Sequence, residues 1–494
     1  MTNFLVIGVG PHARRSHLPA LAAGQAAGLV GTVCGVDLVG VADAIVPYQA
    51  DDGPRSLPVT LVERFDADCR TLPEPVRRTL DTVVEQRRIG AVVVSTEPSH
   101  HLVYVRWALE RGLSVLLDKP LSVQPGVSTD PARAGAVLDD ADALLNLYAA
   151  ARERYPRLMV SVQCQRRYHP AFTRMRQLIA EVAHATNCPV TSIQSFHSDG
   201  QWRLPDELAD LSYHGYDRGY GKCAHSGYHF FDLVPWLVEA GERPGKELDS
   251  VSVHARITRP ADTLAQLGVA DHERLLPGFA ARNPYTQQQL EAATSTFGEV
   301  DAFLSLAFTS HGRTMTLGSI NLVHNGYSRR AHLTPAGSLY TGNGRVRQET
   351  HIIQQGPFQA LHFHSFQALD HTSADGQGHV EVHVLRNHRV RQGWQPYTRL
   401  DHQALTTSAG SSGITAPTQP SARRRAVEEF LDYLGGRLAR DQMASELTTH
   451  RRAATLMAGS YLSMARQWNG SPQPAVLDFR TIPAPAPRPA GALR

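Results

Sequence analysis

Gly8-Val9-Gly10-Pro11-His12-Ala13 is the stretch that decides the fold of this chain. An apolar run of strand length, residues 4–9, leads into it, and Leu18 and Leu21 follow at helical spacing. The glycines permit a tight turn and a close backbone approach to a ligand, and the free N–H groups at a helix start attract phosphate. The stretch therefore predicts a strand, turn and helix that hold a dinucleotide through Gly8, Gly10, His12 and Ala13.

Strand-like and helical patterns alternate beyond this turn. A helix is expected at 73–89, where Val76, Leu80 and Val83 share one face, and another from about Leu102 to Gly112. Further buried strands are expected at 37–42, 91–94, 113–117 and 158–163. Because strands that alternate with helices form parallel sheets, we predict an α/β Rossmann domain with a doubly wound parallel sheet over residues 1–165.

The pattern changes in the second part of the chain. Segments 250–257, 302–308, 314–323 and 380–385 are apolar or alternating runs of strand length with turn residues between them. They predict an α+β domain with a large, mainly antiparallel sheet over residues 166–480, expanded around 250–420. The Pro/Ala-rich residues 481–494 are expected to form a disordered tail.

The acid expected to meet the adenosine ribose is Asp43, at the end of the strand predicted over 37–42. Asp43 lies 30 residues beyond Ala13, whereas about 20 is typical, and the Gly/Ala-rich stretch 22–35 is expected to absorb the difference. A carboxylate there accepts hydrogen bonds from ribose hydroxyls and repels a 2′-phosphate, which favours NAD. Arg14 and Arg15 nearby leave NADP open as an alternative cofactor.

Charge and cysteine usage narrow the class of ligand. The formal net charge is only +3 over 494 residues, and Arg423-Arg424-Arg425 is the one dense basic block. We therefore expect a small-molecule substrate and neither nucleic acid nor a membrane as partner. The five cysteines form no C-x-x-C pair, and no leader or long apolar segment is recognisable, so we expect a cytoplasmic protein without disulfides or a metal site.

Lysine is scarce in this chain. Only Lys119, Lys222 and Lys246 stand among the 49 basic residues. Chemistry that needs an amine with an adjustable pKa cannot use a guanidinium group, which stays charged. A lysine inside a motif is therefore a candidate for function, although a leftover surface lysine is the alternative for each.

Several motifs together resemble those of one family. They are Gly8-Val-Gly10 with His17-Leu-Pro-Ala-Leu21, Val92-Val-Val-Ser95-Thr96-Glu-Pro98-Ser-His-His101, Asp118-Lys119-Pro120, Arg166-Arg167-Tyr168-His-Pro170 and Gly227-Tyr228-His229-Phe-Phe-Asp232. The sequence resembles the oxidoreductases related to glucose–fructose oxidoreductase and inositol dehydrogenase (the Gfo/Idh/MocA type). The resemblance covers residues 1–240 and returns at 450–468, while 250–420 matches poorly.

The resemblance implies roles for individual residues. Asp118 stands where the family has Glu and would lie near the nicotinamide ribose, and Lys119 would contact the reacting hydroxyl. An ammonium group there stabilises the alkoxide that develops as hydride leaves. Ser95, Thr96, Pro98 and His101 would lie against the cofactor, with a helix-start role as the alternative for His101. Arg167, Lys222 and Tyr228 are candidate substrate contacts, with a structural ion pair as the alternative for Arg167 and a loop position for Lys222.

The family's Asp-x-x-x-His motif is altered here to His225-Ser-Gly-Tyr-His229. A spacing of four places both imidazoles on one face of a helix. By resemblance His229 is the acid/base, and His225 replaces the acid, so a protonated His225 would lower the pKa of His229. The pair also fits two ligands of a metal site, but no third ligand is identifiable by spacing.

These observations predict an NAD-dependent dehydrogenase or reductase of a sugar, cyclitol or related polyol or carbonyl compound. By resemblance, its subunits would form a homodimer or homotetramer through the second sheet. Two alternatives remain, since fold does not decide function. One is an enzyme that retains NAD without net redox change, of the epimerase, glycosidase or lyase type. The other is a non-catalytic, nucleotide-sensing regulator.

Overall fold

A computed structural model describes residues 1–41, 57–209, 213–333, 344–368, 378–408 and 418–480. The predicted tail and Asp43 therefore lie outside the described residues. None of the described helices is long and apolar enough to cross a membrane.

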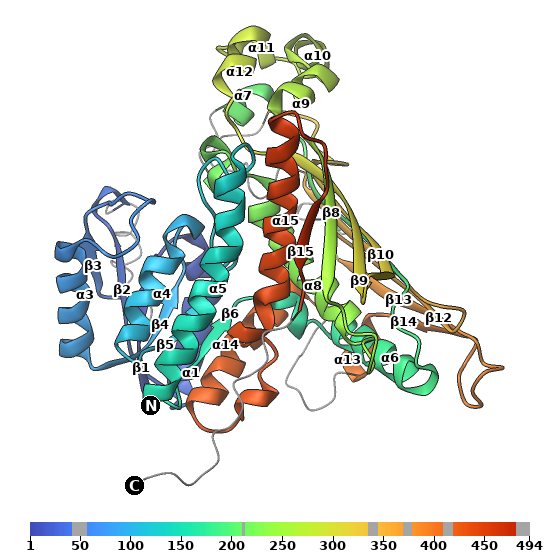
Figure 1. The fold of residues 1–494 in the computed structure, drawn as a ribbon. Coiled ribbons are helices and arrows are strands. Elements are labelled where there is room, and N and C mark those ends of the chain that lie inside the picture. Colours follow the sequence, from blue (N-terminus) through green and yellow to red (C-terminus); the bar gives the residue numbers. More distant parts are fainter. Residues whose placement is uncertain (42–56, 210–212, 334–343, 369–377, 409–417, 481–494) are drawn as a thin grey trace, which may run out of the picture.

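The first sheet has six parallel strands in the order β3-β2-β1-β4-β5-β6. Its strands are β1 (Thr2–Ile7), β2 (Val30–Leu38), β3 (Val59–Val62), β4 (Ile89–Val94), β5 (Ser114–Leu117) and β6 (Val160–Val162). The helices α1 (Leu18–Ala26), α3 (Glu74–Arg87), α4 (His101–Glu110) and α5 (Pro131–Arg154) connect them (Figure 1). Side chains on both faces are buried, including Leu5 and Val6, as expected of a parallel sheet covered by helices. The predicted doubly wound sheet is confirmed.

The second strand lies earlier than predicted. Residues 37–42 were expected to form it, but β2 spans Val30–Leu38, and Val36 pairs with Ile7 of β1. The branched side chains of Val30, Thr32 and Val33 favour a pleated strand over the linker expected at 22–35. Consequently Asp37, and not Asp43, is the acid at the carboxyl end of the described strand.

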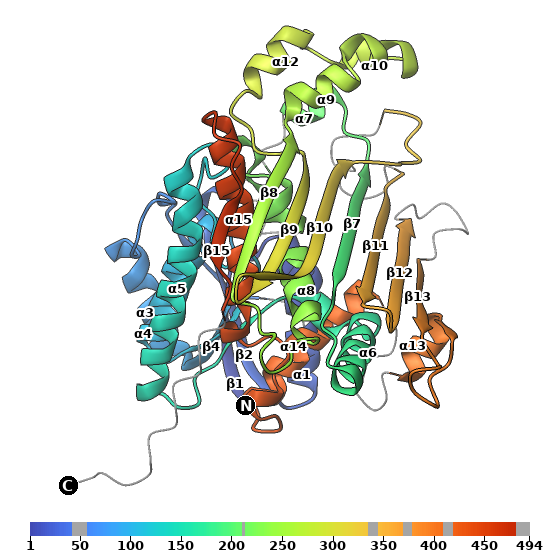
Figure 2. The same cartoon turned by 45° about the vertical axis from the view of Figure 1, so that its right-hand side comes forward.

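The second sheet has nine strands in the order β14-β13-β12-β11-β7-β10-β9-β8-β15. Figure 2 shows the strands from β8 to β13 of this order side by side. All neighbours are antiparallel except β7 and β10, so the predicted mainly antiparallel sheet is confirmed. The strands are β7 (Ser192–Gln201), β8 (Ser250–Thr258), β9 (Asp301–Ser310), β10 (Arg313–Asn325), β11 (Val346–Gln355), β12 (Gln359–Ala368), β13 (His379–Arg386), β14 (Tyr397–Leu400) and β15 (Ala475–Asp478).

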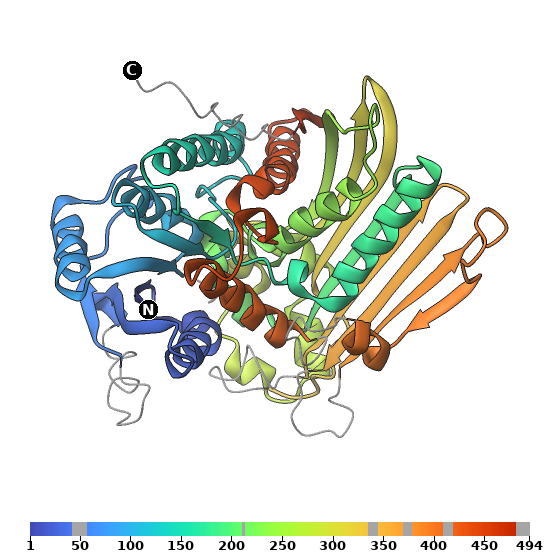
Figure 3. The ribbon, with the colours of Figure 1, turned by 90° about the horizontal axis from the view of Figure 1, so that it is seen from below.

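One face of this sheet is covered by helices. Figure 3 shows α6 (Pro170–Thr186), α8 (Tyr228–Glu239) and α15 (Arg451–Trp468) on the same side of the strands. Phe303 and Leu317 belong to the other face and are 48% and 60% exposed. The small helices α7 (Pro205–Ala209), α9 (Pro260–Gln266), α10 (Val269–Leu275), α11 (Phe279–Arg282) and α12 (Gln287–Ala293) gather at one end of the sheet (Figure 1).

A late helix returns to the first sheet. After α13 (His402–Ser408), helix α14 (Gln419–Leu434) buries Val427, Phe430 and Leu431 in the same apolar cluster as residues of β1. The rings of Phe4 and Phe430 meet edge to face at 6.3 Å. The start of α14 is thereby held over the region between the two sheets. The boundary predicted at residue 165 stays a prediction.

Candidate functional site

A cleft of about 1370 Å³ lies between the two sheets. One wall consists of the loops at the carboxyl ends of β1, β2, β4 and β5, where ligands bind in open α/β sheets. The other wall comes from β7, β11, the start of α8 and the start of α14. Of the predicted site residues, it is lined by Gly8, Gly10, His12, Ser95, Thr96, Pro98, Asp118, Lys119, His225 and His229.

The glycine turn has the shape that a dinucleotide requires. Gly8 has a φ of +87°, and a Cβ there would clash with the carbonyl oxygen of Ser95. A Cβ at Gly10 would point into open space within the cleft. The turn thus leaves room for a pyrophosphate against the backbone at residues 8–12. Ala13 is fully buried behind the turn and does not line the cleft, which corrects its assignment as a cofactor contact.

Asp37 occupies the place predicted for Asp43. It lines the cleft, and its Oδ2 accepts a 2.8 Å hydrogen bond from the backbone N–H of Val9 in the glycine turn. Asp37 follows Ala13 by 24 residues, close to the usual spacing of about 20. The usual spacing of about 20 residues therefore favours Asp37 over Asp43 in the sequence as well.

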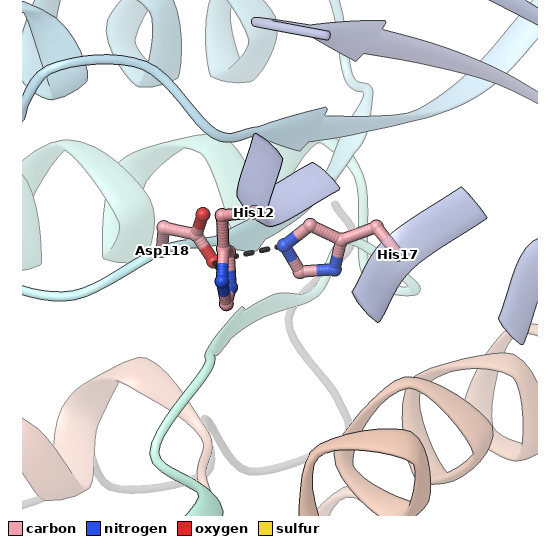
Figure 4. A group of neighbouring side chains, drawn as sticks. All are labelled: His12, His17 and Asp118. Carbon is pink, nitrogen blue, oxygen red and sulfur yellow. Dashed lines mark hydrogen bonds and ion pairs between the residues drawn. The ribbon is translucent and has the colours of Figure 1, made fainter. Parts of the chain in front are cut away.

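Asp118 is held by two histidines and a serine (Figure 4). Its carboxylate accepts a 2.6 Å hydrogen bond from Ser95 Oγ, and His17 Nε2 lies at 2.9 Å and His12 Nε2 at 3.6 Å. Burial opposes ionisation, but the imidazoles of His17 and His12 outweigh it and hold the pKa of Asp118 well below its usual range. His17 is fully buried; it belongs to a motif that carries the resemblance but was not predicted as a site residue.

The ligand atoms of His12, His17 and Asp118 are close enough together to hold a metal ion, so the expected absence of a metal site stays a prediction.

Lys119 follows Asp118 on the same loop and lines the cleft. Its ammonium group donates a hydrogen bond to the backbone carbonyl of His225. This contact links the two walls, because Lys119 follows β5 and His225 precedes α8. It positions the lysine beside the two predicted histidines.

His225 and His229 both line the cleft, although the backbone between them is not a regular α-helix. Cys223–Gly227 forms a π-helical turn that leads into α8, and such turns are frequent at functional sites. Burial, together with the positive charges of Arg166, Lys119 and Arg423, lowers the pKa of His229 well below its ordinary value. The pKa of His229 is thus lowered, as predicted. The predicted cause was a protonated His225, whereas the causes in the structure are burial and these other positive charges.

His101 and Lys222, predicted as cofactor and substrate contacts, are buried next to the cleft and do not line it. His101 is buried, and its ring nitrogens lie 2.7 Å from the carbonyl of Pro120 and 3.1 Å from that of Thr96. It ties the two cofactor loops together without lining the cleft. Lys222 is completely buried and donates a 2.6 Å hydrogen bond to the carboxylate of Asp199, a residue that lines the cleft. Neither residue can serve as the direct contact that was expected.

Two further predictions are corrected because the side chains point into the core. Arg167 is buried in a bidentate ion pair with Asp232 of α8, with a shortest N–O distance of 2.6 Å. The structural alternative considered for Arg167 is therefore the right one. Tyr228 is fully buried, and its hydroxyl has no hydrogen-bond partner among the described residues. The helical turn directs His229 to the cleft and its neighbour Tyr228 away from it.

Sequence reasoning missed most of the second wall. The residues it did not predict are His197 and Asp199 on β7, Arg166, Arg203, Arg345, Arg347, Gln419 and Arg423. Two of the arginines carried a signal: Arg166 stands in the Arg-Arg-Tyr motif, and Arg423 begins the one dense basic block. The others come from segments far apart in the chain, so only the sheet brings them together.

Comparisons with known proteins agree with this geometry. Residues 2–134 match the sequence model of the oxidoreductase family with an NAD-binding Rossmann fold. No curated protein matches the chain.

Among solved structures, the fold is similar to an oxidoreductase from Sinorhizobium meliloti, at 14% identity over 96% of this chain and 99% of that chain, with a TM-score of 0.55. It is also similar to the WlbA dehydrogenase from Bordetella pertussis in complex with NADH and UDP-GlcNAcA, at 12% identity over 94% and 96% of the two chains, with a TM-score of 0.53. A third is KijD10, a 3-ketoreductase from Actinomadura kijaniata in complex with NADP and TDP-benzene, at 14% identity over 92% and 95%, with a TM-score of 0.50. At these identities the likeness shows the fold. The sequence match is therefore confined to residues 2–134, which are similar to the NAD-binding Rossmann domain of this oxidoreductase family.

Proposed function

We propose that this protein is an NAD-dependent oxidoreductase that transfers hydride between the nicotinamide and a carbon of a polyol-like substrate. The observation that carries the proposal is that Lys119 and His229 line the same cleft as the glycine turn. A cofactor bound at residues 8–12, with Asp37 on its ribose and Asp118 nearer the nicotinamide, would extend toward both side chains. NAD, when bound, supplies the hydride acceptor or donor.

The protein side chains would manage the proton and the charge. The lowered pKa keeps His229 neutral near pH 7, so its ring can take the proton of a substrate hydroxyl during oxidation. Its Nδ1 is buried and has no hydrogen-bond partner among the described residues. The ammonium group of Lys119 would donate a hydrogen bond to the same substrate oxygen and stabilise negative charge as it develops.

A sugar, cyclitol or related carbonyl compound is the proposed substrate class. The support is indirect: two structures of similar fold are a dehydrogenase with UDP-GlcNAcA and a 3-ketoreductase with TDP-benzene. The cleft is also large enough for a sugar beside the cofactor.

The test is a panel of sugars, cyclitols and their oxidised forms incubated with NAD or NADH, while the absorbance of reduced nicotinamide is followed. We expect turnover by the unmodified protein and little turnover by His229→Asn. Substrate conversion without a change in absorbance, by protein that retains NAD through purification, would instead show an enzyme without net redox change. Binding of sugars without conversion would favour a regulator.

Pairing of subunits through the uncovered face of the second sheet is part of the proposal. Phe303 and Leu317, on the neighbouring strands β9 and β10, expose apolar surface there. We expect an oligomer in sedimentation velocity, and Phe303→Glu to shift it toward monomer. An unmodified protein that sediments as a monomer at micromolar concentration would contradict this.

A further inference from the structure

The arginine-rich second wall of the cleft also contains an imidazole that takes no part in the proposed proton transfer. His197 stands on β7 and lines the cleft, although only 2% of the residue is exposed. A buried polar group without a hydrogen-bond partner costs free energy, so each ring nitrogen needs a partner in the protein or in the cleft.

One ring nitrogen of His197 has a partner in the protein. Nδ1 lies 3.2 Å from Nζ of Lys222, and the same Nζ donates a 2.6 Å hydrogen bond to Oδ2 of Asp199. Burial lowers the pKa of Lys222 to about 8, so near pH 7 the side chain is chiefly an ammonium group. An ammonium group only donates hydrogen bonds. Nδ1 of His197 is therefore the acceptor.

The ring proton of His197 is then on the other nitrogen. Burial, together with the positive charges of Lys222 and Arg166, holds the pKa of His197 well below its ordinary value. The ring is therefore neutral near pH 7 and carries one proton, which Nδ1 cannot hold while it accepts from Lys222. Nε2–H of His197 is thus a fixed hydrogen-bond donor.

This donor has no acceptor in the wall itself. Within the part of the chain that the structure describes, the ring of His197 forms one hydrogen bond, the one with Lys222. Oδ1 of Asp199 lies 4.0 Å from Nε2, which is too far for a hydrogen bond. Because His197 lines the cleft, its Nε2–H is available to an oxygen of a molecule bound there.

His197 also lies close to the predicted acid/base. Its ring packs against that of Phe230, with 5.0 Å between the ring centroids, and Phe230 follows His229 in α8. His229 lines the same cleft. A substrate whose reacting hydroxyl meets His229 would therefore bring its other oxygens toward His197.

We propose that His197 determines specificity by donating a hydrogen bond from Nε2 to a second oxygen of the substrate, beside the oxygen that reacts. Lys222 is the positioning residue that holds His197 in the donating tautomer. The inference rests on the proposed hydride transfer and restricts its substrates to compounds with at least two oxygens, such as polyols and hydroxyketones. A simple alcohol would leave Nε2–H unpaired in a buried site, and sites built around a hydrogen bond discriminate strongly against such analogues.

Two variants of His197 that differ in the place of their amide test the inference. His197→Asn keeps an acceptor for Lys222 near the place of Nδ1 but has no donor at the place of Nε2, whereas the longer side chain of His197→Gln keeps a donor there. His324→Asn is the control, because His324 is also buried and lies 3.5 Å from Asp199 but does not line the cleft. Thermal unfolding of each variant first establishes that it folds.

The probes are cyclohexanol and the 1,2-, 1,3- and 1,4-cyclohexanediols, which differ only in the presence and place of a second oxygen. With NAD, we expect kcat/KM of the unmodified protein to be at least about tenfold higher for one diol than for cyclohexanol, the effect of one hydrogen bond. We expect this preference to be lost in His197→Asn and kept in His197→Gln and His324→Asn. Equal values for all four alcohols, or a preference that survives in His197→Asn, would overturn the inference.

The positioning role of Lys222 has its own readout. Lys222→Met allows either ring nitrogen of His197 to carry the proton, so the preference for the diol should fall. The same substitution made in His197→Gln should leave the preference of that variant unchanged, because an amide donor needs no lysine to fix it. A lysine with a structural role alone would lower the rates and leave both preferences unchanged, which would overturn the positioning role.

Binding measured without turnover separates this inference from the proposed function. With NADH present, we expect at least one diol to raise the unfolding temperature of the unmodified protein more than cyclohexanol does at the same concentration. This difference should be absent in His197→Asn and present in His197→Gln. Such a result without any reduction of NAD by the diols would contradict the proposed hydride transfer and keep the role of His197. Reduction of NAD at equal rates with all four alcohols would do the reverse, and the absence of any difference in either measurement would also overturn the inference.

Discussion

Lys222 and Asp199 form an ion pair directly behind the arginine-rich wall of the cleft, with 2.6 Å between Nζ and Oδ2. Both side chains are almost completely buried, and Asp199 also contacts Arg345 and His324. Burial lowers the pKa of Lys222 to about 8, although the carboxylate of Asp199 opposes the shift. The pair fixes β7 against the turn before α8, and with it one side of the proposed substrate site.

Loss of this lysine should destabilise the fold. Lys222→Met leaves the carboxylate of Asp199 buried without its ammonium partner, and breaking a buried pair typically costs about 3–5 kcal/mol. Because Arg345 and His324 remain, we expect a loss near the lower end of that range in urea unfolding. Lys246→Met, at a surface lysine outside the cleft, is the control. A loss equal to that of the control would show that the pair contributes little.

The free energy of unfolding should depend on pH in part through the titration of Lys222. The pKa falls from 10.5 to about 8 on folding, so between these values the unfolded chain binds more protons than the folded protein. The contribution of this group to the free energy of unfolding therefore rises as pH increases from about 8 to 10.5. We expect this rise to be smaller in Lys222→Met. Parallel profiles for the two proteins would mean that Lys222 titrates in the same way in both states.

Cofactor choice should depend on Asp37. Its carboxylate lines the cleft and accepts from Val9, and a negative charge there opposes a 2′-phosphate. Asp37→Asn keeps an acceptor for Val9 but removes the charge, so we expect the ratio of the NADP to the NAD dissociation constant to fall about tenfold. Asp43→Ala, at the position predicted first, should leave the ratio unchanged. Fluorescence titration measures both dissociation constants. A ratio that falls in Asp43→Ala and stays unchanged in Asp37→Asn would show that Asp43 is the acid at the ribose.

The sequence predicted the fold better than it predicted the second wall of the site. Local signals sufficed for the glycine turn, the alternating strands and the Asp118-Lys119 loop, because each is a continuous segment with a period or a motif. Arg347 carries no such signal, and the basic block that begins at Arg423 does not reveal what it faces, because β11 and α14 are far apart in the sequence and come together only in the folded chain. Tyr228 shows the limit of motif reasoning, because it stands one residue before the cleft-lining His229 on the same helix and yet its side chain is buried in the core.

Lys119 should be needed for turnover more than for binding. Its ammonium group is expected to stabilise charge that develops only as hydride moves, so Lys119→Met should lower kcat about 10²–10⁴-fold and change the dissociation constant of NAD little. Steady-state kinetics and NAD titration measure the two effects. A near-normal kcat in Lys119→Met would show that this lysine has only a structural role, through its hydrogen bond to the backbone carbonyl of His225.

The histidine pair should set the lower pH limit of oxidation. His229 must be neutral to accept a proton, so activity is present above its pKa and is lost as pH falls through it. Arg166, Lys119, Arg423 and His197 all act to keep that pKa low. A carboxylate introduced by His225→Asp would oppose their field and raise the pKa of His229. The low-pH limb of the kcat profile should then move to higher pH, whereas the uncharged His225→Asn should move it less. An unmoved limb in His225→Asp, together with an active His229→Ala, would show that the pair performs no acid/base chemistry.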